Sequence, residues 1–77
     1  MFSYNIEKET SEKKFTEACK KIEEKVNDIQ KDELLEDVDG TQIQIYYKNK
    51  RKIKVMNDYE VDAVYIDSEI SLDDIFS

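Results

Sequence analysis

Histidine is missing from this sequence, and its absence bears first on catalysis and metal binding. Histidine is the usual general base near neutral pH and the commonest metal ligand in proteins. The chain also carries no glycine-rich phosphate-binding loop and no nucleophile elbow. We therefore expect a protein that is not an enzyme, has no catalytic residues and binds neither a metal nor a cofactor.

Cysteine, glycine and proline are almost absent, since Cys19 and Gly40 are single and there is no proline. One cysteine excludes a disulfide within the chain, which suits a reducing compartment. Cys19 lies on the apolar stripe of a predicted helix, where a thiol behaves as a small buried hydrophobe. Flexible linkers are rich in glycine or proline, so the composition predicts a folded chain.

Long hydrophobic runs are missing as well. No apolar stretch approaches the roughly 18–20 residues that cross a bilayer. The N-terminal residues contain no basic segment followed by an apolar one, so they do not resemble a secretory signal. We expect a cytoplasmic protein with no membrane partner.

The charge of the chain is unevenly distributed along it. Residues 1–30 carry seven acids and six bases, residues 31–54 carry five acids and six bases, and residues 55–77 carry seven acids and no base. The whole net charge of −7 therefore resides in the last third. Such segregation sets partner preference and association rate. The acids of this third are Asp58, Glu60, Asp62, Asp67, Glu69, Asp73 and Asp74.

The first half of the chain predicts one strand and one helix. Residues 2–7 alternate between apolar and polar, which is typical of a half-buried strand. Apolar residues then recur every three or four positions and predict a helix over 11–30, which Thr10 or Ser11 can cap. Residues 31–40 break this period and predict a kinked or irregular segment that ends at Asp39-Gly40. The helical stripe consists of Phe15, Ala18, Cys19, Ile22, Val26 and Ile29.

The second half predicts three strands, over 41–48, 52–57 and 61–67, followed by a short helix over 71–76. Pairing Tyr47 with Ile53 and Ile45 with Val55 keeps the apolar residues of both strands on the face that meets the helix. These residues are Ile43, Ile45 and Tyr47 on the first strand and Ile53 and Val55 on the second. This register leaves Asn49-Lys50-Arg51 as a three-residue hairpin loop, and the same reasoning places Val55 across from Val61. The fold class is α+β, and residues 1–77 form a single domain. Its order is β-α-β-β-β: an antiparallel three-strand meander plus the N-terminal strand, with the long helix packed on one face.

The predicted register also places large apolar residues on the face of the sheet away from the helix, where a solvated surface seldom has them. One explanation is a homodimer or a docking site for another protein. A second is that the C-terminal segment covers the face, and a third is a bulge in the last strand that reverses the assignment. The residues of this candidate dimer face are Tyr46, Met56, Val64 and Ile66.

Two further segments resemble binding motifs only in part. Aligning Gly40 with the invariant glycine of a calcium loop puts Leu35 and Tyr46 where two essential acids belong, so an Asp-Gly turn is the better interpretation. Five bases within residues 48–54 could form a contact for phosphate or for an acidic partner. They also suit a solvated hairpin, in which Lys54 lies across from Asp62.

The leading functional hypothesis is a small acidic protein-binding module that acts by occlusion, as an inhibitor, antidote or regulatory adaptor does. Its partner would be a protein with a basic surface, and charge complementarity would speed association. Its contacts would be the seven acids of the last third, with Tyr46 and Tyr59 as aromatic anchors.

Two alternatives remain open. The first is a structural homodimer packed through the outer sheet face, and the second is a nucleic-acid mimic that occupies a basic groove. The mimic is the weaker of the two, because the main helix mixes Lys and Glu almost evenly. Direct binding of nucleic acid is not expected at this net charge. A composition rich in Lys, Ile, Asn and Asp would suit a phage or other mobile element.

Overall fold

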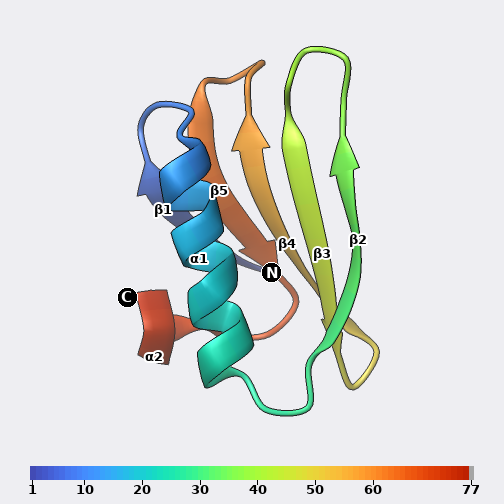
Figure 1. Ribbon diagram of the computed structural model, residues 1–77. Helices are drawn as coiled ribbons and strands as arrows, with labels where there is room; N and C mark the ends of the chain where they lie inside the picture. The colour runs from blue at the N-terminus through green and yellow to red at the C-terminus, as the bar shows by residue number, and fades with distance from the viewer. Residues whose placement is uncertain (77) are drawn as a thin grey trace.

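The computed structural model describes residues 1–76, so Ser77 at the end of the predicted domain lies outside it. The fold is α+β, as predicted, with a five-stranded antiparallel sheet in the order β1-β5-β4-β3-β2 and both helices on one face (Figure 1). The strands are β1 Phe2–Glu7, β2 Gln30–Glu36, β3 Gln42–Lys48, β4 Arg51–Asp58 and β5 Ala63–Ser68, and the helices are α1 Glu12–Lys25 and α2 Asp73–Phe76.

Helix α1 begins where predicted and ends five residues earlier. The Ser11 side chain accepts a hydrogen bond from the Lys14 amide and caps the first turn. After Lys25 the chain becomes extended at Val26, and Asp28 adopts a positive φ of 57°, which Asp tolerates. Val26 and Ile29 nevertheless pack against the core from this connection. Their burial explains why the apolar spacing continued beyond the end of the helix.

Strand β2 was not predicted, because residues 31–40 were interpreted as a kinked or irregular segment. Residues 30–36 instead pair with β3, so that β3 is an interior strand and β2 lies at the edge of the sheet. A bulge between Lys31 and Leu34 interrupts the alternation, and all seven residues are exposed. An edge strand of this kind lacks the buried, alternating pattern that identifies strands in a sequence.

The predicted register of the β3–β4 hairpin is wrong by one residue. The connection is a two-residue turn, Asn49-Lys50, in which both residues have positive φ, 50° and 67°. Such turns match the twist of the flanking strands. Tyr46 therefore pairs with Ile53, and Gln44 pairs with Val55.

The slip in register exchanges the two faces of β3. Tyr46 faces α1 and is fully buried, whereas Ile43, Ile45 and Tyr47, predicted for the core, lie on the outer face. A one-residue shift always has this consequence, because successive side chains point to opposite sides of a strand.

Strand β5 starts two residues later than predicted, after the loop Tyr59–Asp62. Val55 consequently pairs with Ile66 instead of Val61, and Lys54 lies across from Asp67 instead of Asp62. Val64 and Ile66 therefore point into the core, where both are fully buried. The prediction therefore assigned the wrong face of β5 to the core. The third explanation allowed for such a reversal through a bulge in the strand, but the cause is the later start of β5.

The core lies between α1 and the inner face of the sheet. The C-terminal segment closes it from the same side: Leu72 is buried in the core cluster, and the Phe76 ring lies 6.0 Å from the Tyr4 ring. The Tyr4 hydroxyl donates to Asp73 at 2.7 Å and accepts from the Leu72 amide at 2.7 Å. The C-terminal segment therefore covers the inner face, and the second explanation, in which it covers the outer face, is wrong. The core cluster comprises Phe15, Ala18, Cys19, Ile22, Tyr46, Ile53, Val55, Val64, Ile66 and Leu72.

Length and polarity rule out α1 and α2, the two helices within residues 1–76, as candidates for a membrane span.

Candidate functional site

Three loops lie together at one end of the sheet and form an acidic loop end. They are the β1–α1, β2–β3 and β4–β5 connections, at the top of Figure 1. With their flanking residues, 7–12, 36–41 and 58–62, they contain nine acids and one lysine, a net charge of −8. The opposite end, at residues 25–31, 48–52 and 69–72, contains six bases and two acids. The sheet thus separates charge along its strands.

Hydrogen bonds hold the β1–α1 and β4–β5 loops to each other. The Thr10 amide donates to Asp62 at 2.9 Å, across 52 residues of sequence. Asp58 accepts from the Glu60 amide at 2.9 Å and from the Tyr65 hydroxyl at 2.9 Å. Partial burial and the bond to Asp58 raise the pKa of Tyr65 to about 12. Asp58 and Asp62 therefore fix loop geometry as well as contributing charge.

The β2–β3 loop is anchored to the same structure. The Tyr59 amide donates to the Thr41 hydroxyl at 3.0 Å, and the Tyr59 ring lies 3.6 Å from the position of a Cβ on Gly40. Asp39 accepts from the Thr41 amide at 2.9 Å, a bond that holds the pKa of Asp39 below its usual range. The acidic loop end is thus one cross-linked surface.

Asn57, a buried residue of β4, connects the loops to the core. Its side-chain oxygen accepts from the Ser11 amide at 3.0 Å, and its amide nitrogen donates to the Gln42 side chain at 3.0 Å. Asn57 is fully buried on β4. One side chain therefore positions the start of α1 and the start of β3.

The acidic loop end also exposes apolar side chains. Val38 is completely exposed, Val61 is 62% exposed and Tyr59 is 49% exposed. Apolar and aromatic groups within a charged rim are a common composition of protein interfaces.

The seven predicted contact acids do not form one surface. Asp58, Glu60 and Asp62 lie in the acidic loop end together with the predicted anchor Tyr59. Asp67 lies on the outer face opposite Lys54, and the Glu69 side chain accepts from the Lys52 amide at the other end of the sheet. The last two, Asp73 and Asp74, lie on α2.

Acids from the first half of the chain complete the site instead. Six such acids belong to the three loops and their flanking residues and had not been predicted as contacts: Glu7, Glu9, Glu12, Glu36, Asp37 and Asp39. A β-hairpin interpretation of residues 30–48 would have revealed three of them, because it places residues 36–41 at the same end as residues 58–62.

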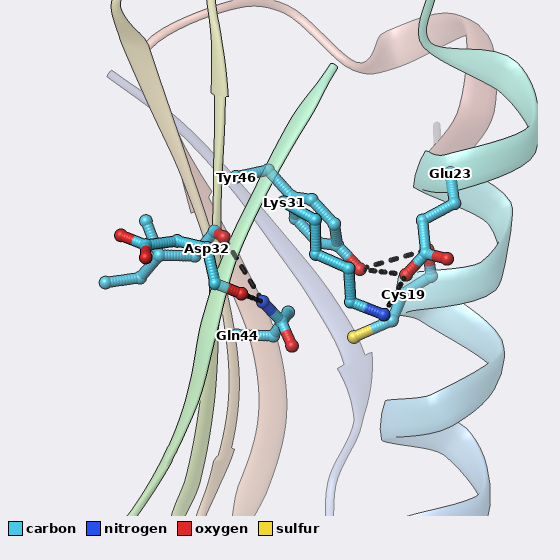
Figure 2. A network of polar contacts seen from close by, with 7 residues as sticks. Cys19, Glu23, Lys31, Asp32, Gln44 and Tyr46 are labelled. Carbon is cyan, nitrogen blue, oxygen red and sulfur yellow. Dashed lines mark hydrogen bonds and ion pairs between the residues drawn. The ribbon is translucent and has the colours of Figure 1, made fainter.

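Tyr46, the other predicted anchor, is fully buried and belongs to a polar network between α1 and β2 (Figure 2). Its hydroxyl donates to Glu23 at 2.5 Å, and Lys31 lies 3.1 Å from the same carboxylate oxygen. The Tyr46 bond, assisted by Lys31, holds the pKa of Glu23 below its usual range. Burial and the bond to Glu23 raise the pKa of Tyr46, so the phenol stays protonated.

A shallow groove of about 390 Å³ lies beside this network, between α1 and β2. The Gln44 side chain forms part of its wall and donates to the Asp32 carbonyl at 2.6 Å, which secures the bulge in β2. Burial raises the pKa of the Cys19 thiol, so the thiol stays protonated, as expected for a core cysteine. The groove is lined by Phe15, Thr16, Cys19, Lys20, Glu23, Lys31, Leu34 and Gln44.

Replacing Tyr46 by phenylalanine should raise the pKa of Glu23 towards its ordinary value, because the strongest bond to the carboxylate is lost. A lowered carboxyl pKa contributes stability above the unfolded-state value, about 4.3, and the contribution is lost as pH falls through the folded-state value. The acid-side loss of stability due to Glu23 should therefore shrink. A carboxyl NMR titration measures the pKa. Tyr47→Phe, on the other face of β3, is the matched control, and an unchanged Glu23 pKa in Tyr46→Phe would contradict the assignment.

The outer face of the sheet has an apolar row that differs from the predicted one. The register aligns Leu35, Ile43, Met56 and Tyr65 across four strands. Of the predicted face residues only Met56 lies here, since Tyr46, Val64 and Ile66 are in the core. Lys54 and Asp67 lie across from each other on the neighbouring row.

No group of His, Cys, Asp or Glu side chains within residues 1–76 is arranged to hold a metal ion. Comparison of the chain with protein-family models, curated proteins and solved structures gives no significant match.

Proposed function

We propose that this chain is a small, non-catalytic protein-binding module that acts by occlusion, in the manner of an inhibitor, antidote or regulatory adaptor. It binds a basic protein surface through the acidic loop end. The observation that carries this proposal is the convergence of nine acids and three exposed apolar side chains on loops that are hydrogen-bonded to one another.

Two physical properties support this surface over others on the molecule. A concentration of like charge at one end produces a field that steers a basic partner before contact, which raises the association rate. The cross-linked loops are already ordered, so binding costs little conformational entropy. Tyr59 provides a rigid aromatic contact and is held at its backbone by Thr41.

Charge reversal at this end should abolish partner capture at low salt. The variant combines Glu9→Lys, Glu60→Lys and Asp37→Asn, all at exposed positions, and changes the net charge from −7 to −2. The asparagine keeps an oxygen that can accept the bond of the Val38 amide. Capture from a lysate of the source cells, followed by mass spectrometry, should recover the partner with the wild-type chain and lose it with the variant.

The matched control is Glu17→Lys, Glu24→Lys and Asp74→Asn, which also changes the net charge from −7 to −2. These residues are exposed and lie outside the acidic loop end. The control should retain the partner. Equal loss in both variants would show that only net charge matters, and unchanged capture in the first would contradict the proposal. A captured protein that itself binds nucleic acid would favour the mimic form of this function.

A second candidate function is a structural homodimer packed through the outer sheet face. The apolar row of Leu35, Ile43, Met56 and Tyr65 favours it, because both helices lie on the other face (Figure 1). Such a dimer should persist in high salt, since apolar contacts are not screened. Light scattering of the wild-type chain and of Ile43→Glu tests it.

A further inference from the structure

Strand β2 forms an edge of the sheet with apolar side chains on both of its faces. Among the strands within residues 1–76 it pairs only with β3. Leu34 is 43% exposed and Leu35 is 46% exposed. An edge strand with exposed leucines on both faces is a template for pairing with another strand.

The hydrogen-bond pattern shows which backbone groups point outward from this edge. The Asp37 amide donates to the Thr41 carbonyl at 2.9 Å, so these two residues form a hydrogen-bonded pair. Hydrogen-bonded and non-hydrogen-bonded pairs alternate in an antiparallel ladder. The backbone groups of Leu35 therefore point towards β3, and those of Leu34 and Glu36 point outward.

The bulge determines which side chains share a face. Lys31, Leu34 and Glu36 pair with inner-face residues of β3, and Asp32 with Glu33 together occupy the single position between Lys31 and Leu34. The inner face of β2 thus carries a base, a leucine and an acid at equal spacing. In an antiparallel pair of such strands, the base of each strand lies opposite the acid of the other and the two leucines lie opposite each other. The charges of two copies are therefore complementary.

We propose that a second copy of this chain pairs with β2 in antiparallel fashion, about a two-fold axis at Leu34. Leu34 then faces Leu34 of the second copy, and Lys31 faces the second copy's Glu36 on both sides of the axis. Isologous contacts of this kind are the commonest in homodimers. The two sheets join into one continuous sheet of ten strands.

This register is the only one that keeps inner faces together and pairs Lys31 with Glu36. Moving the axis to the bulge places Lys31 against Leu34, and moving it to Leu35 places Leu34 against Glu36. Axes at Lys31 or Glu36 bring like charges together, which is destabilising. Charged residues usually protect an edge strand from association, but here they select one partner strand.

Salt should affect this contact in the opposite direction to the acidic loop end. Each copy has a net charge of −7, and β2 itself carries three acids and one base. Screening of this repulsion should strengthen the dimer as salt rises. Lys31 also lies 3.1 Å from Glu23 of its own copy, but its side chain is 55% exposed.

Light scattering and sedimentation equilibrium of the wild-type chain, up to about 1 mM, test the proposal, because a Kd of that order corresponds to only about 4 kcal/mol. We expect a concentration-dependent dimer. Lys31→Glu and Glu36→Lys should each weaken it at least tenfold. An equimolar mixture of the two variants should dimerise again, since each supplies the charge that the other lacks. Amide exchange at Leu34 and Glu36 should slow as concentration rises.

Three results would overturn the proposal. They are a wild-type chain that stays monomeric at the highest concentration, single variants that dimerise as the wild type does, and a mixture that stays monomeric. Ile43→Glu is the control, because Ile43 lies on the outer face, and it should retain the dimer. Loss of the dimer in Ile43→Glu, with a normal melting temperature, would assign the contact to the outer face instead.

Discussion

Replacing Ile22 by alanine should lower the free energy of unfolding by about 2–5 kcal/mol, because two buried methyl groups and a methylene group are lost and a cavity remains. Ile22 is fully buried as the last of the four buried residues of α1, and it belongs to the core cluster. A chain of 77 residues has a total stability of roughly 4–12 kcal/mol. We therefore expect this single change to remove a large part of it.

Urea denaturation followed by circular dichroism measures the effect. Val38→Ala is the matched control: it shortens an aliphatic side chain that is completely exposed, and should leave stability unchanged within about 0.5 kcal/mol. A loss below about 1 kcal/mol in Ile22→Ala would mean that the site collapses around the cavity, or that α1 does not pack as described.

Replacing Asn57 by alanine should cost about 1–3 kcal/mol, because buried polar groups lose their partners. The Ser11 amide at the start of α1 and the Gln42 side chain would both lose a hydrogen bond. The loss should concentrate at the acidic loop end, where Asn57 joins α1 to the sheet. Partner binding should weaken with it.

Denaturation gives the total effect, and amide exchange at Ser11 and in the first turn of α1 gives its location. Asn5→Ala is the control, because Asn5 is exposed on the edge strand β1. Uniform destabilisation without faster exchange near Ser11 would contradict the anchoring role of Asn57. Asn57→Asp offers a second comparison, since it keeps the acceptor for Ser11 and loses the donor for Gln42.

Local sequence signals predicted the parts of this fold whose residues alternate or recur on one buried face. β1 was identified with its observed bounds, Phe2–Glu7. α1 was identified with its four buried residues, Phe15, Ala18, Cys19 and Ile22. The two strands β3 and β4 were located to within a residue, and Asp39-Gly40 was identified as a turn. In each case burial on one side imposes a period that the sequence displays.

Strand β2 gave no such signal, for a physical reason. It is exposed on both faces and carries a bulge, so neither burial nor regular alternation constrains its residues. Its pairing with β3 depends on backbone hydrogen bonds, which leave little trace in side-chain pattern. The end of α1 was predicted too late for the opposite reason. Val26 and Ile29 contact the core and continue the apolar spacing, although they lie beyond the helix.

The register of the meander depended on two loops. Apolar residues occupy both faces of β3, so hydrophobicity alone could not choose between Tyr46 and Tyr47 for the core. The choice follows from a two-residue turn with left-handed Asn49 and Lys50, and from the start of β5 at Ala63. One residue of loop length thus decides which face is buried.

The sequence by itself determined the α+β class, the helix and its buried stripe, the net charge and its excess of acids, and the absence of histidine. Those features depend on composition and local period, which need no knowledge of distant contacts. Only the tertiary structure decided that acids from three loops converge, that Tyr46 is buried, and that β2 is an open edge. These depend on strand pairing between segments far apart in the chain, where hydrogen bonds and loop geometry fix the positions of side chains.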